Sequence, residues 1–194
     1  MAIQANGAIV VAGSSDGDFA LARYTSSGVL DPSFSRDGRV TTDFGSSEND
    51  GAYDVAVQSS DGRIVAAGRG GANLDFALAR YTTGGVLDLS FSGDGKVKTD
   101  FGSSADQAHG LAIQRNGRIV ATGLGATAMT VARDTTVGAL DTSLSGDGKV
   151  TIDFGDPAAA TGVAIQPSNG RIVAAGIVSR FTDADFAVAR YLEA

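Results

Sequence analysis

The sequence predicts an all-β protein, and three observations support that class. A motif of short apolar runs recurs four times along the 194 residues, each time around an Asn-Gly or Asp-Gly pair that is typical of hairpin turns. Glycine accounts for 27 residues, about twice its usual share of ~7%, which fits many tight turns. No window repeats its apolar residues at helical spacing.

The clearest copy of the motif is the segment 55–81, VAVQSSDGRIVAAGRGGANLDFALARY. It contains three apolar runs, and Asp61-Gly62 joins the first two. Because both central residues of a type I′ turn need positive φ, we expect a two-residue hairpin turn at this pair. The same turn is expected in every copy, and the full set of turn residues is Asn6, Gly7, Asp61, Gly62, Asn116, Gly117, Asn169 and Gly170.

A second block follows each of the first three copies. It reads LDPSFSRDGRVTTDFG from Leu30, LDLSFSGDGKVKTDFG from Leu87 and LDTSLSGDGKVTIDFG from Leu140. Each unit is therefore expected to hold four strands, which in the second unit are 54–58, 63–68, 75–81 and 96–101. The last unit is expected to lack its outer strand. The four units are predicted at residues 2–45, 52–102, 108–155 and 161–192 of one domain.

The strands are apolar on both faces. In the segment 75–81, the bulky Phe76 and Leu78 lie on one face, and the small Ala77 and Ala79 lie on the other. A sheet with one solvated face would instead alternate apolar and polar residues. A four-stranded sheet that is covered on both sides by copies of itself is a blade of a β-propeller. A parallel β-helix is the alternative, but its repeats lack Asn-Gly hairpins.

The pattern DGRIVAAG, DFALARY and LDxSFSxDGxVxTDFG resembles the delta-60 repeat, a bacterial propeller-type repeat, and a longer relative of the NHL repeat. The resemblance extends over essentially the whole chain. It implies a propeller with no catalytic residues to transfer, and it favours an extracellular or cell-surface location. The third unit departs most, with Ala128, Met129 and Asp134 in place of the Asp, Phe and Tyr of DFALARY, and Leu144 in place of a phenylalanine.

Composition argues against several function classes. A net charge of −7 argues against a nucleic-acid or anionic membrane surface, and no apolar run approaches the ~20 residues of a membrane-spanning helix. The chain has no cysteine, which excludes disulfides and thiolate metal sites. The N-terminal segment MAIQANGAIVVAG lacks a basic region and already belongs to the repeat, so it does not read as a signal peptide. We expect no catalytic residues and no cofactor.

One arginine recurs in all four units, on the strand face that carries the bulky residues, as Arg23, Arg80, Arg133 and Arg190. A buried guanidinium requires a carboxylate partner, so structural ion pairs are expected. One set of candidate partners follows the outer strand and consists of Asp43, Asp100 and Asp153. The other precedes it and consists of Asp31, Asp88 and Asp141. Aspartates on the opposite face are poor partners, namely Asp18, Asp75 and Asp185. Anion binding by the arginines is the alternative.

Metal binding is not expected. The turns at Asp37, Asp94 and Asp147 each offer one carboxylate, which indicates β-turns, whereas a calcium loop needs several oxygen donors at alternating positions. Calcium at these turns is the alternative. His109 is the only histidine and is expected in a loop before an inner strand.

The function predicted is a non-enzymatic repeat scaffold that self-associates. An arc of four blades leaves two apolar faces in water, and a twofold pair of chains closes an eight-bladed ring. A four-bladed monomeric ring is the structural alternative. A lectin-like propeller is the functional alternative, although the chain has no Trp and four Tyr. A protein or a glycan is the candidate ligand, and neither nucleic-acid binding nor membrane insertion is expected.

Overall fold

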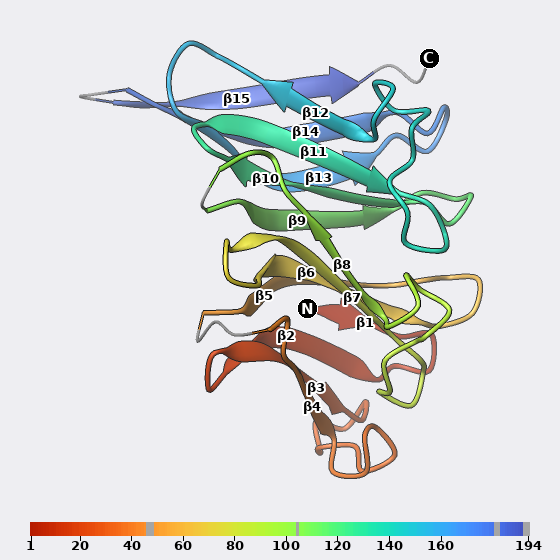
Figure 1. Cartoon of the computed structure of the whole chain (residues 1–194). Coiled ribbons are helices and arrows are strands. Elements are labelled where there is room, and N and C mark those ends of the chain that lie inside the picture. The colour runs from red at the N-terminus through yellow and green to blue at the C-terminus, as the bar shows by residue number, and fades with distance from the viewer. Residues whose placement is uncertain (46–48, 104, 181–182, 192–194) are drawn as a thin grey trace.

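The structure is a computed structural model that describes residues 1–45, 49–103, 105–180 and 183–191. These residues form four antiparallel sheets, stacked face to face in chain order, with the first and last sheets at opposite ends of the stack (Figure 1). This confirms the all-β propeller fold, and it shows that the four blades do not close into a ring by themselves. In the described part of the chain, no helix is long and apolar enough to cross a membrane.

Each sheet is one blade, in which strands that follow one another in the chain are paired. Blade 1 contains β1 (Ala2–Ile3), β2 (Ile9–Ser15), β3 (Asp18–Tyr24) and β4 (Arg39–Thr42). Blade 2 contains β5 (Gly51–Val57), β6 (Ile64–Gly70), β7 (Asp75–Tyr81) and β8 (Lys96–Thr99). Blade 3 contains β9 (Gln107–Ile113), β10 (Ile119–Gly125), β11 (Ala128–Asp134) and β12 (Lys149–Ile152). Blade 4 contains β13 (Ala158–Ile165), β14 (Ile172–Ser179) and β15 (Ala184–Tyr191); the unit expected at 161–192 includes residues 181–182 and 192, which lie outside the described ranges.

The hairpin turns between the first two long strands are longer than expected. In blade 2, Gln58 N donates to Arg63 O and Gly62 N donates to Gln58 O, both at 2.8 Å, which closes a four-residue loop. Only Gly62 of the Asp-Gly pair has positive φ, at 75°. Asp61 instead accepts a hydrogen bond on Oδ1 from Arg63 N (3.0 Å), the backbone N two residues later. The asparagines of the other turns, Asn6, Asn116 and Asn169, each accept the same bond from the backbone N two residues after them. The type I′ prediction is therefore wrong, and the loops have three or four residues with a left-handed glycine at the end.

A β-bulge interrupts the first strand of blades 2, 3 and 4. The pairing of β5 with β6 shifts between Ala52 and Asp54, which leaves Tyr53 as the extra residue, and His109 and Thr161 take that place in β9 and β13. The opposite strand carries a glycine because the bulged backbone comes very close: a Cβ on Gly68 would lie 1.9 Å from Gly51 O. The bulge extends strand pairing beyond the expected start, so the loop position predicted for His109 is wrong.

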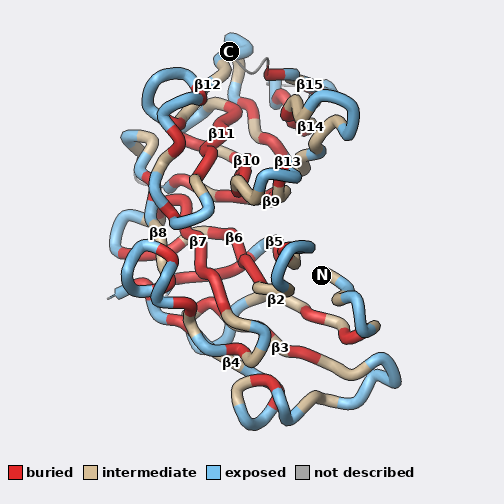
Figure 2. The backbone as a smooth tube through the Cα atoms, turned by 90° about the vertical axis from the view of Figure 1, so that its right-hand side faces the viewer, coloured by how far each residue is buried: buried red, intermediate tan, exposed pale blue. Residues whose placement is uncertain are grey.

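Each blade packs its bulky face onto the small face of the next blade. Phe76 and Leu78 of β7 are 1% and 2% exposed and lie in one apolar cluster with Ala121 and Ala132 of blade 3. The same arrangement repeats at the other two junctions. Burying a Phe or Leu side chain contributes roughly 1.5–3 kcal/mol. The buried positions are accordingly concentrated in the middle blades, along β6, β7, β10 and β11 (Figure 2).

Blade 3 buries a carboxylate where the other blades carry tyrosine. The Tyr81 hydroxyl forms a hydrogen bond with Thr42 Oγ1 of blade 1 at 2.7 Å. Asp134 takes the equivalent position in β11, is fully buried, and has no hydrogen-bond partner for either carboxylate oxygen among the described residues. Burial, with a smaller contribution from the charge of Asp141, raises the pKa of Asp134 to about 7.

We expect Asp134 to make the protein less stable as the pH rises from about 4 to about 7. Its pKa is 3.8 when unperturbed and about 7 when folded, so between these values the folded state holds one more proton than the unfolded state. The free energy of unfolding then decreases with pH, by at most about 1.4 kcal/mol per pH unit. Thermal unfolding of the parent and of Asp134→Asn from pH 4 to pH 8 measures this slope.

The Asp134→Asn variant should lose the pH slope, and Asp134→Tyr should lose it and also gain stability. A tyrosine at position 134 is expected to reach Thr99, which occupies in β8 the place that Thr42 occupies in β4. The same slope in the parent and in Asp134→Asn would refute this assignment.

Candidate functional site

The recurring arginine of a blade binds a carboxylate and the next blade at the same time. In blade 2, Arg80 Nε donates to Asp88 Oδ2 (2.8 Å), Nη2 donates to Ser90 Oγ (3.1 Å), and Nη1 donates to Thr136 O of blade 3 (2.5 Å). The guanidinium also lies over the ring of Phe91, 4.5 Å from its centroid. We call this buried group of Arg80, Asp88, Ser90, Phe91 and Thr136, and its equivalents, the arginine clasp.

The arginine clasp recurs in two further blades. In blade 1 its members are Arg23, Asp31, Ser33, Phe34 and Thr83. In blade 3 the ion pair between Arg133 and Asp141 (2.8 Å) and the hydrogen bond from Arg133 to Ser143 (2.8 Å) are kept, although Leu144 replaces the ring. Arg190 of blade 4 lies exposed on the face that no further blade covers.

The structure selects one of the two expected sets of partners, Asp31, Asp88 and Asp141. The backbone explains this, since Asp88 N donates to Arg80 O at 2.8 Å and so fixes the two residues side by side. Asp43, Asp100 and Asp153 do not pair with the arginines. Each follows an outer strand that runs antiparallel to the arginine strand, so it lies at the opposite end of the blade. There each accepts a hydrogen bond from the glycine N two residues later.

Two guanidiniums flank the carboxylate of Asp88. Arg63 Nε lies 2.7 Å from Asp88 Oδ2, in addition to Arg80 Nε at 2.8 Å. Burial raises the pKa of Asp88, but hydrogen bonds from Ser90 and the charges of Arg80 and Arg63 outweigh it and leave the pKa below its ordinary value. The same balance, with Ser143, Arg133 and Arg118, lowers the pKa of Asp141. The clasp carboxylates are therefore ionised at neutral pH, as a structural ion pair requires.

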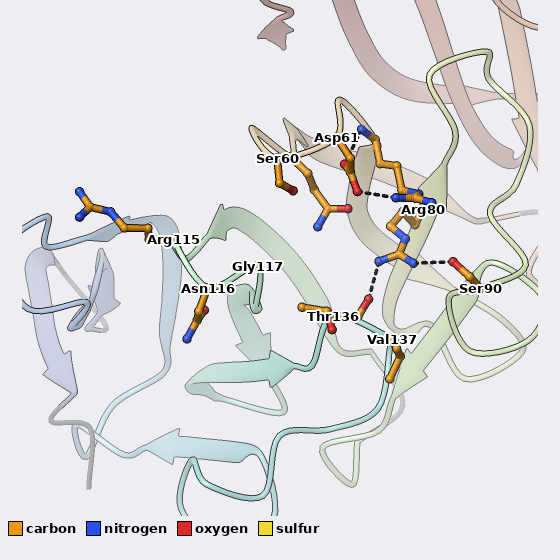
Figure 3. Close-up of a pocket in the computed structure, with 11 residues that line it drawn as sticks. Ser60, Asp61, Arg80, Ser90, Arg115, Asn116, Gly117, Thr136 and Val137 are labelled. Carbon is orange, nitrogen blue, oxygen red and sulfur yellow. Dashed lines mark hydrogen bonds and ion pairs between the residues drawn. The ribbon is translucent and has the colours of Figure 1, made fainter.

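A polar pocket of about 350 Å³ lies beside Arg80, between the hairpin turns of blades 2 and 3 (Figure 3). Arg80 is held there by Ser90 and Thr136, and Arg115 on the far side points away from it (Figure 3). Arg63, which also lines the pocket, is bound to Asp61 and Asp88. The charged groups that line the pocket next to the clasp are thus already engaged.

Similar pockets lie at the neighbouring junctions. The one between blades 1 and 2 is lined by Asn6, Arg23, Asp61 and Thr83, among others, which are the equivalents of Asp61, Arg80, Asn116 and Thr136 in the first pocket. A shallower one lies between the turns at Asn116 and Gly170. Recurrence at each junction indicates a consequence of blade packing rather than a single specialised site.

The other residues singled out by the sequence have simple structural surroundings. Asp37, Asp94 and Asp147 each accept a hydrogen bond at 2.9 Å from the backbone N two residues later, the pattern of an Asx turn. His109 lies in the bulge of β9, with Nε2 3.2 Å from Gln107 Oε1 and Nδ1 3.3 Å from Ala160 O.

The tyrosines at the strand ends differ in their exposure. Tyr81 and Tyr191 are buried, and Tyr24 is half-buried at the end of β3. Tyr53 is the most exposed of the four, and its ring contacts the edge of His109 with 5.5 Å between centroids.

Comparison with known proteins supports a β-propeller repeat family. Residues 4–34 and 59–91 match the family described as "Domain of unknown function (DUF5122) beta-propeller". The crystal structure of a protein from Lactobacillus plantarum is similar, with a TM-score of 0.57 and 13% identity, over 97% of this chain and 53% of that one. At this identity the likeness shows the fold alone, and the chain spans about half the length of that protein. No curated protein matches the chain significantly.

The clasp predicts that Arg80→Ala destabilises the protein by about 3 kcal/mol, the lower end of the range for breaking a buried ion pair. The lower end is expected because Arg63 still contacts Asp88 in the variant. Urea unfolding monitored by circular dichroism measures the change. Arg180→Ala is the control: Arg180 is 59% exposed and pairs with Asp156 and Asp185, so its loss should cost about 0–1 kcal/mol. Equal unfolding midpoints for Arg80→Ala and the parent would show that the clasp is not structural.

Proposed function

We propose that the protein is a non-enzymatic propeller scaffold in which two copies associate to close an eight-bladed ring. The observation that carries this proposal is the complementarity of the two ends of the stack. Blade 4 presents the bulky face and blade 1 presents the small face, and at each internal junction these two kinds of face are buried against each other.

The exposed end of blade 4 is strongly apolar. Phe186 and Val188 of β15 are 79% and 52% exposed, although their equivalents in blade 2, Phe76 and Leu78, are almost fully buried. Ile177 of β14 extends the same patch. A cluster of large apolar side chains in water is unfavourable and marks an association surface.

The opposite end offers a matching surface. Val11, Ala20 and Ala22 of blade 1 are partly exposed and line a shallow groove of about 330 Å³. Their equivalents in blade 2 are buried small side chains, and Phe19 and Leu21 of blade 1 pack against them. Phe186 and Val188 of a second copy correspond to Phe19 and Leu21, so the groove is expected to receive them in the same way.

A second copy is the occupant that continues the existing interface. Contact between unlike faces is heterologous, and two such contacts related by a twofold axis close a ring instead of a filament. Eight blades need a turn of about 45° per blade, within the range of known propellers. The length of the Lactobacillus plantarum protein, about twice the span matched here, is consistent with a ring of this size.

A scaffold function agrees with the chemistry of the pockets. The charged groups beside Arg80 bind one another, so the pocket presents hydroxyl and backbone groups of the hairpin turns rather than an activated nucleophile. Catalysis needs a nucleophile or base aimed at a substrate position, and the arrangement around the clasp supports the packing of blades.

Light scattering after size exclusion tests the ring. The parent should have twice the mass of the chain, and Phe186→Glu should be a monomer because a charge replaces the side chain that enters the groove. Ala20→Glu, on the receiving face, should have the same effect. Leu89→Glu is the matched control, since Leu89 is 67% exposed in a loop of blade 2 away from both ends. A parent that stays monomeric at high micromolar concentration would overturn the proposal.

A further inference from the structure

Three carboxylates meet at the junction of blades 2 and 3. Asp75 is the first residue of β7, Asp100 follows the last residue of β8, and Asp106 immediately precedes β9 of the next blade. The antiparallel pairing of β7 with β8 and the short connection to β9 bring them together. Their carboxylate oxygens lie within 4.8 Å of one another.

Two of the three carboxylates are held in place by hydrogen bonds. Asp106 Oδ2 accepts from Phe101 N (2.7 Å), and Oδ1 accepts from Ser103 Oγ. Asp100 Oδ1 accepts from Gly102 N (2.5 Å). The backbone therefore fixes both groups in position beside Asp75, without neutralising their charge.

Asp75 has no such partner. It is 8% exposed, and its Oδ1 is buried with no hydrogen-bond donor among the described residues. Burial raises the pKa of Asp75, and the charges of Asp100 and Asp106 raise it further. A buried carboxylate that faces two others is costly unless a cation joins them.

The junction of blades 1 and 2 repeats the cluster with Asp18, Asp43 and Asp50. Asp50 is held in the same manner, since it accepts from Phe44 N (2.7 Å) and from Gly71 N (2.8 Å) of blade 2. Asp18, like Asp75, opens the third strand of its blade.

The junction of blades 3 and 4 has lost two of the three carboxylates together. Ala128 opens β11 where Asp75 opens β7, and Ala158 replaces Asp106 at the start of the next blade, whereas Asp153 remains. Ala158 N donates to Thr127 O at 2.8 Å, as Asp50 N donates to Gly17 O at 2.7 Å, so the backbone contact between the blades is kept where the carboxylates are lost. Joint loss is expected if the two aspartates bind one shared ligand.

We propose that Asp75, Asp100 and Asp106 form a calcium site between blades 2 and 3, and that Asp18, Asp43 and Asp50 form a second one between blades 1 and 2. Carboxylate oxygens without histidine or cysteine suit a hard cation. Oxygens that lie within 4.8 Å of one another can all contact one Ca²⁺ ion, which takes carboxylate ligands at about 2.4 Å. Each ion would join two adjacent blades. The site differs from the Asp37, Asp94 and Asp147 turns.

Lys98 is the competing cation at the cluster of Asp75, Asp100 and Asp106, because its charge partly offsets the rise in the pKa of Asp75. Thr41 takes its place in blade 1, where Asp16 adds a further negative charge near Asp18 instead. The cluster of blade 1 is therefore expected to bind calcium more tightly than the cluster of blade 2.

Calorimetric titration of the EDTA-treated full chain with Ca²⁺ tests the sites. The parent should bind two ions, Asp75→Asn and Asp18→Asn should each bind one, and the double variant should bind none. Asp94→Asn, at a turn, is the matched control and should bind two. No heat and no shift in melting temperature at millimolar Ca²⁺, or two ions bound by Asp75→Asn, would overturn the proposal.

The melting temperature, measured with and without calcium, is a second readout. A merely structural role of Asp75 would not make its response depend on calcium. Without calcium, Asp75→Asn should melt at a higher temperature than the parent, because one of three crowded charges is removed. With saturating calcium the order should reverse, because the parent gains the binding energy of one more ion. The same order in both conditions would contradict a cation site, and so would calcium binding that appears only in Lys98→Ala. These measurements do not depend on whether the ring closes.

Discussion

Packing of a bulky sheet face onto a small one is the constraint on which this structure depends. A blade can be covered on both sides only if every junction joins unlike faces, because two bulky faces would push the blades apart and two small ones would leave voids. The alternation of Phe76 and Leu78 with Ala77 and Ala79 meets this requirement within a single strand. The same rule gives the stack a direction and leaves one face of each kind at its ends.

The arginine clasp fixes the same junctions at a second point, away from the apolar cluster. Arg80 reaches Thr136 of the next blade, and Ser92 N donates to Val137 O at 2.8 Å. The Phe91 ring fills the space beside Gly138, where a Cβ would lie 2.9 Å from the ring. With φ of 83°, that position also suits glycine alone. Neighbouring blades are therefore held at their sheet faces and at their loops, which restricts the angle between them.

The sequence predicts the structural features that are local and periodic. It does not predict the features that depend on which strands pair and in which register. Alternation in the segment 75–81 gave the two faces directly, since strand side chains alternate with period two. Asp-Gly was ambiguous, because a left-handed glycine also ends longer loops. The partner of Arg80 depended on the antiparallel course of β8, which carries Asp100 to the far end of the blade. The bulge at Tyr53 is one extra residue that only the pairing with β6 reveals.

Sequence analysis did not predict the acidic clusters, because Asp106 belongs to the start of the next blade. The recurrence of the three carboxylates becomes visible only when the junctions between blades are compared. Such a comparison separates two kinds of repeated feature. The ion pair of the clasp persists in blade 3 even where Leu144 has replaced the aromatic ring, so the packing of blades requires it. Asp75 and Asp106 have no counterparts at the next junction, although its blades pack in the same way. A feature that one junction can lose while the fold is kept is not needed for packing, and the proposed calcium sites account for its presence at the other two junctions.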